Sequence, residues 1–207
     1  MKRMIAVMAS AVALAAAAPA MTASAQQAPG TASTVGIKTG TYQIDASHTQ
    51  VTLSWMHMGF NPYHAIAQAS EGTLVLDPAK PAASSVQITV PVANIKTNSE
   101  HLDAQLAGEG FFDAAKFPNI TFKSTSVVAD GKGGANVTGN LTIKGVTKPV
   151  TIKAKFVGQG TNPMAKTYTV GFEGWLTIKR SDFGVDAYVP VVGDEVKMQI
   201  SAAFEMK

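Results

Sequence analysis

Strict alternation of apolar and polar residues between Gly139 and Val157 is the feature that most constrains the fold. Leu141 and Ile143 share one face of the first run. One face of the second run carries Val150, Ile152, Ala154 and Phe156. Such alternation is typical of strands with one face buried and one in water. The intervening stretch from Gly145 to Pro149 supplies a permissive glycine and a proline that cannot pair in mid-sheet. We therefore predict an antiparallel hairpin with an apolar inner face and a Thr/Lys outer face.

The same period of two recurs along the rest of the chain. It predicts strands near residues 42–44, 51–57, 65–69, 73–76, 86–92, 120–128, 168–178 and 196–206. Gly, Asn and Pro between Gly59 and His64 are expected to interrupt the sheet. Pro91 lies within an alternating run, which predicts an edge strand or a bulge.

One segment carries helix signals instead. Thr97 and Glu100 have the spacing of a capping box, in which each residue satisfies the other's backbone N–H. Leu102 and Leu106 are four residues apart and form one apolar stripe, and Gly108 or Gly110 ends the segment. The sequence thus predicts one short helix.

These ten alternating runs, some of them short, predict an all-β fold of about eight main strands with one short helix in a single domain. A closed antiparallel barrel is favoured over a sandwich because long amphipathic strands would otherwise leave exposed edges. A barrel of this size is either filled by its own side chains or holds a small ligand. Small residues in the inward phase favour the second alternative, namely Ala65, Ala67, Ala69, Gly174 and Ala202.

The N-terminal region has the three parts of a secretory signal peptide. Lys2 and Arg3 precede an apolar, alanine-rich run, and Ala23-Ser24-Ala25 matches a cleavage site. We predict a signal peptide at residues 1–25, a flexible leader at 26–40 and the folded domain at 41–207. The mature protein is then expected in the periplasm, without stable membrane insertion.

Charge and cysteine content exclude several classes of function. The chain has 17 basic and 14 acidic residues, and removal of Lys2 and Arg3 leaves 15 against 14, a net charge of +1. Nucleic-acid binding is not expected, because it would need a clustered basic patch and the sequence contains none. The chain has no cysteine, which excludes disulfides, thiol chemistry and a lipoprotein anchor.

Six stretches, in order, resemble the YceI-like family of polyisoprenoid-binding, lipocalin-like proteins. They are YQID at 42–45 with SH at 47–48, HMGF at 57–60, GFFD at 110–113 with FPNITFKS at 117–124, GNLTIKGVTKP at 139–149, RSDFG at 180–184, and VGDEV at 192–196. The resemblance implies an extended eight-stranded antiparallel lipocalin-like β-barrel with one helix near an end. Its apolar tunnel would hold a polyprenyl or fatty-acyl chain, with the polar head near the mouth.

The chain departs from the family pattern near the helix. Where the family has Arg-Asp-x-His-Leu, this chain has Leu-Asp-Ala-Gln-Leu at 102–106. Of the family's three polar residues it retains only the aspartate, Asp103. Gly110 stands where an acidic residue is common, and Ala65 and Ala67 stand where Gly and Phe are common.

Polar candidates for ligand contact each have a structural alternative. His57 ends a strand in the inward phase, where it would donate to a ligand head group or be satisfied by backbone or a carboxylate. Arg180 would bind a phosphate or carboxylate through two N–H groups, or pair with Asp182, Asp113 or Asp103 and hold the loop. Asp103, on the capped helix, has a structural role as its alternative.

Aromatic residues complete the candidate set. Phe60 and Phe183 lie in or beside loops and are candidates for the tunnel mouth, although packing is the default role of any buried ring. The full set predicted to contact ligand is His57, Phe60, Asp103, Phe111, Phe112, Phe122, Phe172, Arg180 and Phe183. We predict no metal site, since the four histidines lack close spacing and no cysteine joins them.

The sequence therefore predicts a binding or carrier protein and not an enzyme, since no nucleophile motif, phosphate loop or carboxylate pair is present. The expected ligand is a polyisoprenoid, a quinone or a fatty-acyl lipid, and no cofactor is expected. Two alternatives stay open: an enzyme with His57 and Asp103 as acid and base, or a packed barrel that binds an envelope protein. A homodimer is also left open.

Overall fold

The structure is a computed structural model that describes residues 28–207. The predicted signal peptide lies outside this range. The strands are β1 (Gly40–Ile44), β2 (Gln50–His57), β3 (Asn61–Gln68), β4 (Glu71–Leu76), β5 (Ser85–Pro91), β6 (Ile95–Lys96), β7 (Asn119–Ala129), β8 (Gly134–Ile143), β9 (Val146–Thr161), β10 (Tyr168–Lys179) and β11 (Glu195–Met206). The helices are α1 (Glu100–Ala107) and the short 3₁₀ segments η1 (Pro81–Ala83), η2 (Val92–Asn94) and η3 (Arg180–Phe183).

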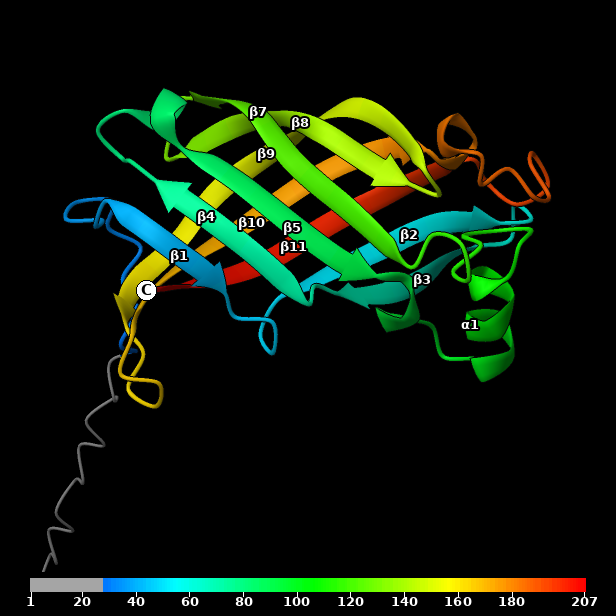
Figure 1. The fold of residues 1–207 in the computed structure, drawn as a ribbon, viewed down its shortest axis with the longest axis horizontal. Helices are drawn as coiled ribbons and strands as arrows, with labels where there is room; N and C mark the ends of the chain where they lie inside the picture. The colour runs from blue at the N-terminus through cyan, green and yellow to red at the C-terminus, as the bar shows by residue number, and fades with distance from the viewer. Residues whose placement is uncertain (1–27) are drawn as a thin grey trace, which may run out of the picture.

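Eight antiparallel strands form a closed, elongated barrel (Figure 1). The ring runs β1-β4-β5-β7-β8-β9-β10-β11 and closes where Tyr42 of β1 pairs with Met206 of β11. Closure removes the free edges that long amphipathic strands would otherwise expose. The predicted eight-stranded antiparallel barrel with one short helix near an end is confirmed.

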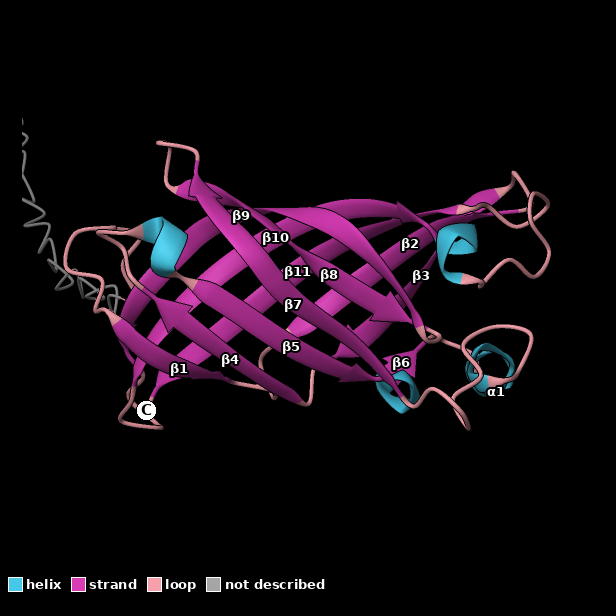
Figure 2. Ribbon diagram, turned by 45° about the horizontal axis from the view of Figure 1, so that its top comes forward, coloured by secondary structure: helices cyan, strands magenta, loops and turns pink. Residues whose placement is uncertain are grey.

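Strand β11 changes partner along its length. Its last residues pair with β1, whereas residues 197–201 pair with residues 50–54 of β2. Strands β2, β3 and β6 therefore continue the sheet beyond the ring, toward the end of the barrel that carries α1 (Figure 2). This extension gives the α1 end an additional wall.

The hairpin formed by β8 and β9 turns more tightly than the sequence predicts. Lys144 and Gly145 have φ values of 49° and 76°, as a two-residue type I′ turn requires. Pro149 was predicted to lie in the turn, which is wrong, because it pairs with Asn140 within the sheet. The pairing of β9 with β10 reaches only as far as Lys153, so no β10 residue is paired with the proline, which has no N–H to donate.

Two other sheet predictions are corrected. Asn61 to His64 belong to β3, and the interruption is confined to a turn in which Met58 and Gly59 have φ values of 51° and 76°. Pro91 does not lie on an edge strand, since β5 has β4 and β7 as neighbours. It is accommodated because β5 ends there and η2 begins.

The predicted helix forms, but its cap differs. Ser99 is the N-cap, and its hydroxyl accepts a hydrogen bond from the backbone N–H of Leu102. The capping box of Thr97 with Glu100 is therefore wrong, because the hydroxyl of Thr97 donates to Asp103 instead. Leu106 is buried against the barrel, and Gly108 ends the helix as one of the two predicted positions.

The described part of the predicted leader lies against the barrel. Thr31 forms an isolated β-bridge with Gln159 of β9. The buried amide of Gln159 donates to the carbonyl oxygens of Ser33 and Val35, at 2.7 and 2.9 Å. These hydrogen bonds fix the segment across the end of the barrel opposite to α1.

Candidate functional site

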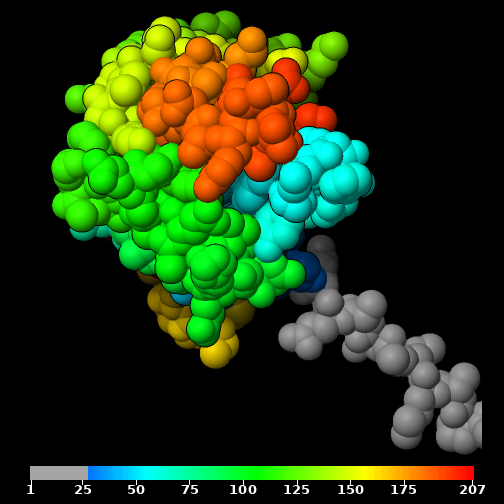
Figure 3. Space-filling view, turned by 90° about the vertical axis from the view of Figure 1, so that its right-hand side faces the viewer, coloured from blue at the N-terminus to red at the C-terminus, as the bar shows by residue number. Residues whose placement is uncertain are grey.

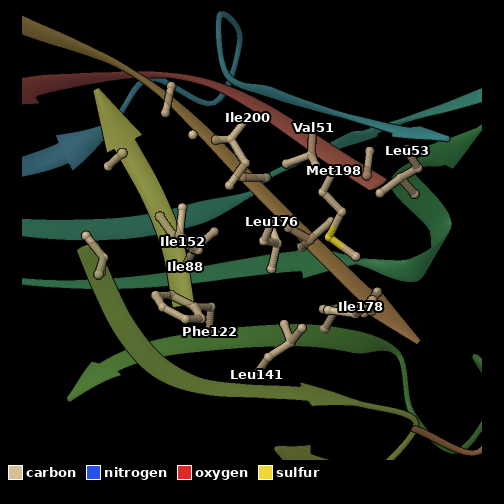
Figure 4. Close-up of a pocket in the computed structure, with 18 of the residues that line it drawn as sticks. Val51, Leu53, Ile88, Phe122, Leu141, Ile152, Leu176, Ile178, Met198 and Ile200 are labelled. Atoms are coloured by element: carbon tan, nitrogen blue, oxygen red, sulfur yellow. The ribbon is translucent and has the colours of Figure 1, made fainter. Parts of the chain in front are cut away.

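A cavity of about 910 Å³ occupies the interior of the barrel. Its middle section is lined by aliphatic and aromatic side chains from seven strands, which point toward a common space (Figure 4). The labelled members are Val51, Leu53, Ile88, Phe122, Leu141, Ile152, Leu176, Ile178, Met198 and Ile200. Most of them are only partly buried although they face inward, because they border empty space and not packed atoms.

Small residues help to keep this space open. Ala67, Ala69 and Ala202 line the cavity, as does Gly174 of β10. A Cβ on Gly174 would lie 3.0 Å from Cγ2 of Ile152, so the wall is tightly packed at that point. Four of the five small residues that predicted an open interior thus line the cavity, whereas Ala65 is buried in the packed core.

The cavity extends to both ends of the barrel. At the α1 end its lining includes Leu102, Phe111 and Val192, and at the opposite end it includes Ile37 and Pro81. An elongated apolar guest can therefore lie along the barrel axis.

Three segments close in around the α1 end. They are the β2–β3 turn, α1 with the loop that follows it, and residues 180–194, drawn in cyan, green and orange in Figure 3. Lys144 joins two of them, since its ammonium group donates to the carbonyl oxygens of Glu109 at 3.0 Å and Gly184 at 3.1 Å. The carbonyl oxygen of Met56 also accepts a hydrogen bond from the backbone N–H of Gly193. These contacts hold the loops over the cavity.

Arg180 is buried in the cavity wall at this end. Its Nε donates to Gly193, its Nη1 to Val185 and Ala187, and its Nη2 to Val192, always to the carbonyl oxygen at 2.7–2.9 Å. Burial lowers the pKa of the guanidinium, and two nearby carboxylates partly offset this. The guanidinium thus holds the loop, as one alternative predicted.

The partners of Arg180 differ from those predicted, however. Asp182, Asp113 and Asp103 form no ion pair with it within the described chain. The backbone of residues 185–193 curls around the guanidinium and supplies carbonyl oxygens in place of a carboxylate. The residue types in this segment could not predict these partners, because the acceptors are backbone carbonyl oxygens.

Asp194 fixes the other side of the same loop. Its carboxylate accepts from the backbone N–H of Ser181 at 2.9 Å and from the Ser181 hydroxyl at 2.8 Å. Desolvation raises its pKa, but these hydrogen bonds and the charges of Arg180 and Lys179 outweigh that effect and lower it.

Seven of the nine predicted contact residues line the cavity: His57, Phe111, Phe112, Phe122, Phe172, Arg180 and Phe183. Phe122 and Phe172 belong to the barrel wall, whereas the others lie at the α1 end. His57 is exposed and so needs no buried partner, and its ring lies 6.3 Å from that of Tyr63. Contact of these residues with a ligand stays a prediction.

Phe60 and Asp103 do not line the cavity. Phe60 is 83% exposed in the β2–β3 turn, because the tight turn directs it away from the barrel end. The carboxylate of Asp103 accepts from the backbone N–H and the hydroxyl of Thr97, both at 2.7 Å. These hydrogen bonds lower its pKa and give it the structural role that the sequence offered as the alternative.

Several lining residues were not predicted as site residues. Trp55 shares the inward phase of β2 with His57, so its period-two position could have identified it. Tyr188 lies in an irregular loop, where its ring is 6.1 Å from that of Phe111, and no periodicity marks it. Gln105 also lines the cavity, although in the sequence it is marked only by its departure from the family pattern.

Within residues 28–207, no group of three or more His, Cys, Asp or Glu side chains could hold a metal ion. The same part of the chain contains no helix that is long and apolar enough to cross a membrane.

Comparisons with known proteins agree with this architecture. A model of the YceI-like domain matches residues 42–204. A UPF0312 protein of Pseudomonas aeruginosa is 37% identical over 162 residues, which cover 77% of this chain and 84% of that protein. The crystal structure of Burkholderia cenocepacia BcnA superposes with a TM-score of 0.70 and 32% identity, covering 77% of this chain and 98% of that one. A polyisoprenoid-binding domain from Saccharophagus degradans, at 12% identity and a TM-score of 0.58, covers 82% and 100% and shares the fold.

Proposed function

The chain belongs to the YceI-like domain family, and we propose that it is a periplasmic carrier that holds an isoprenoid or other long-chain amphiphilic lipid inside its barrel. The observation that carries the proposal is the apolar cavity of about 910 Å³, which reaches both ends of the barrel. A polyisoprenoid-binding domain with the same fold supports an isoprenoid as the guest.

Burial of the lipid tail supplies the binding free energy. A guest that loses about 400 Å² of apolar surface gains roughly 10 kcal/mol at about 25 cal/mol per Å². Association and ordering cost at least about 4 kcal/mol of this. At most about 6 kcal/mol then remains, which corresponds to a Kd of about 40 μM, and a guest that buries more apolar surface binds more tightly.

The arrangement of the polar groups supports a protein that binds a lipid without catalysing a reaction. His57 lines the cavity, whereas the carboxylate of Asp103 is engaged by Thr97 outside it. The two residues therefore do not form an acid–base pair across a bound lipid. The cavity also disfavours the alternative of a fully packed barrel whose outer surface alone has a function.

Export to the periplasm follows from the predicted signal peptide, and it is tested separately. Mass spectrometry of the protein from a periplasmic fraction should give a mature chain that begins at Gln26. An intact N-terminus, or recovery in the cytoplasmic fraction, would contradict the proposed location.

The carrier function is tested by mass spectrometry of organic extracts from the protein purified from its native periplasm. We expect a long-chain isoprenoid or acyl lipid at close to one molecule per chain. The matched control is Leu176→Trp, which fills the middle of the cavity and should purify with much less lipid. Equal lipid content in both proteins, or none in the wild type, would contradict the proposal.

A further inference from the structure

The charged side chains that line the cavity are few and unevenly distributed in sign. Among residues 28–207, no lysine lines it and Arg180 is the only arginine that does. Two acidic residues, Asp77 and Glu173, are among the lining residues, although Glu173 alternates with the inward-facing Phe172 and Gly174 and so has the outward phase of β10. The cavity wall therefore offers an anion at most one permanently positive group.

That positive group is already engaged. A guanidinium has five N–H donors, and Arg180 makes four hydrogen bonds to backbone carbonyl oxygens. At one bond for each N–H, a single donor is left. A phosphate or carboxylate is bound tightly by two parallel N–H groups of one arginine, and this arrangement is not available without opening the loop.

Lys144, one of the lysines at the same end, is engaged as well. The ammonium group of Lys144 donates to the carbonyl oxygens of Glu109 and Gly184 and does not belong to the cavity lining. It acts on the loops from outside and is not directed to a guest inside the barrel.

Uncharged polar groups, by contrast, do line the α1 end. They belong to Gln105, Tyr188 and Tyr63, although the phenol of Tyr63 already donates to Oδ1 of Asn98 and so can only accept from a guest. Amide and phenol groups can exchange single hydrogen bonds with a hydroxyl or a carbonyl. An anion drawn into the cavity would lose its water without gaining a counter-ion, which is costly in an apolar interior.

From this distribution of charge we propose that the cavity selects lipids with an uncharged head group, such as prenyl alcohols, quinones or carboxamides, and discriminates against their phosphorylated or carboxylate counterparts. The inference rests on the proposed carrier function and adds the class of head group to it. Arg180 then serves to form the wall, and its remaining N–H can donate one hydrogen bond to a neutral oxygen.

The test compares two probes that differ only in the head group, geranylgeraniol and geranylgeranyl phosphate, by titration of the delipidated wild-type protein at neutral pH. We expect the alcohol to bind at least about tenfold more tightly. Equal or tighter binding of the phosphate would overturn the inference and leave the carrier function intact. If neither probe binds saturably, the carrier function itself is refuted, and the inference with it.

A matched pair of variants tests whether charge at the α1 end is the cause. Gln105→Lys adds a cation to an exposed position that lines the cavity, whereas Gln199→Lys adds the same charge to the exposed outer face of β11. We expect Gln105→Lys to raise the affinity for the phosphate relative to the alcohol by about fivefold or more, and Gln199→Lys to leave this ratio unchanged. An unchanged ratio in Gln105→Lys, or an equal shift in both variants, would overturn the inference.

Discussion

Nη2 of Arg180 donates a 2.8 Å hydrogen bond to the carbonyl oxygen of Val192, twelve residues further along the chain. Together with three similar bonds it places a buried guanidinium at the centre of the loop that covers one end of the barrel. A single side chain thus determines both the conformation of the loop and the composition of the cavity wall.

Replacement of Arg180 with methionine should destabilise this loop. Four carbonyl oxygens, one buried and three half-buried, would lose their donor, and hydrogen bonds to charged groups contribute about 1.5–3 kcal/mol each. Because the loop can partly relax into water, we expect a loss of about 3 kcal/mol in the free energy of unfolding, measured by urea denaturation. Arg180→Lys should restore little of it, since an ammonium group cannot reproduce the planar fork.

The control for this prediction is Lys179→Met at the exposed neighbouring position. It should change the free energy of unfolding by less than about 0.5 kcal/mol. Similar stability of Arg180→Met and the wild type would show that the loop does not depend on the guanidinium.

Acid should weaken the same loop through Asp194. Its folded-state pKa is lowered, so its contribution to stability is full above the ordinary value of 3.8 and is lost as the pH falls below it through the folded-state pKa. Urea denaturation of the wild type and of Asp194→Asn, across this pH range, measures the effect. The difference in stability between the two proteins should shrink as the pH falls, and a constant difference would contradict the assignment.

Two glycines with positive φ allow the cost of backbone strain to be separated from the cost of steric crowding. Gly145 and Gly131 both have positive φ, 76° and 71°, but only a Cβ at Gly145 would meet a neighbour, Cε1 of Phe117 at 2.6 Å. Gly131→Ala should cost about 1 kcal/mol from the left-handed backbone alone. Gly145→Ala should cost clearly more, and thermal denaturation of both variants compares them. Equal losses would mean that Phe117 moves aside freely.

Filling the cavity should affect binding more than stability. Leu176→Trp places a large ring into space that is empty, so little close-packed structure has to move. We expect geranylgeraniol to bind at least about tenfold more weakly, with a change in unfolding free energy below about 1.5 kcal/mol. Thr177→Trp, on the exposed outer face of the same strand, should bind like the wild type. Unaltered binding by Leu176→Trp would place the lipid elsewhere.

The inner face of the barrel could be predicted because the side-chain period of a strand is exactly two residues. Ile152 and Gly174 were predicted to face the interior from alternation alone, and both line the cavity. The partner change of β11, from β2 to β1, could not be predicted, because alternation determines which face is buried and not which strand lies next to it.

Period-two alternation could predict site residues only on strands, whereas Phe111, Phe112 and Phe183 lie outside strands and were predicted as aromatic candidates. His57 could be identified as a lining residue from its phase, whereas Tyr188 lies in a loop without periodicity. Pro149 misled the prediction because a proline is tolerated within a strand wherever no neighbour requires its N–H. The open interior also depends on the distances between strands, to which no single residue type corresponds.

The most direct test of a lipid-holding interior is a titration of the delipidated Trp175→Phe variant with geranylgeraniol, followed by the fluorescence of Trp55. Trp55 lines the cavity, whereas Trp175 is 38% exposed on the outer face, so the variant reports from the inside alone. The account predicts a saturable change that ends at one lipid per chain. A signal that does not change, or that rises without saturation, would contradict it.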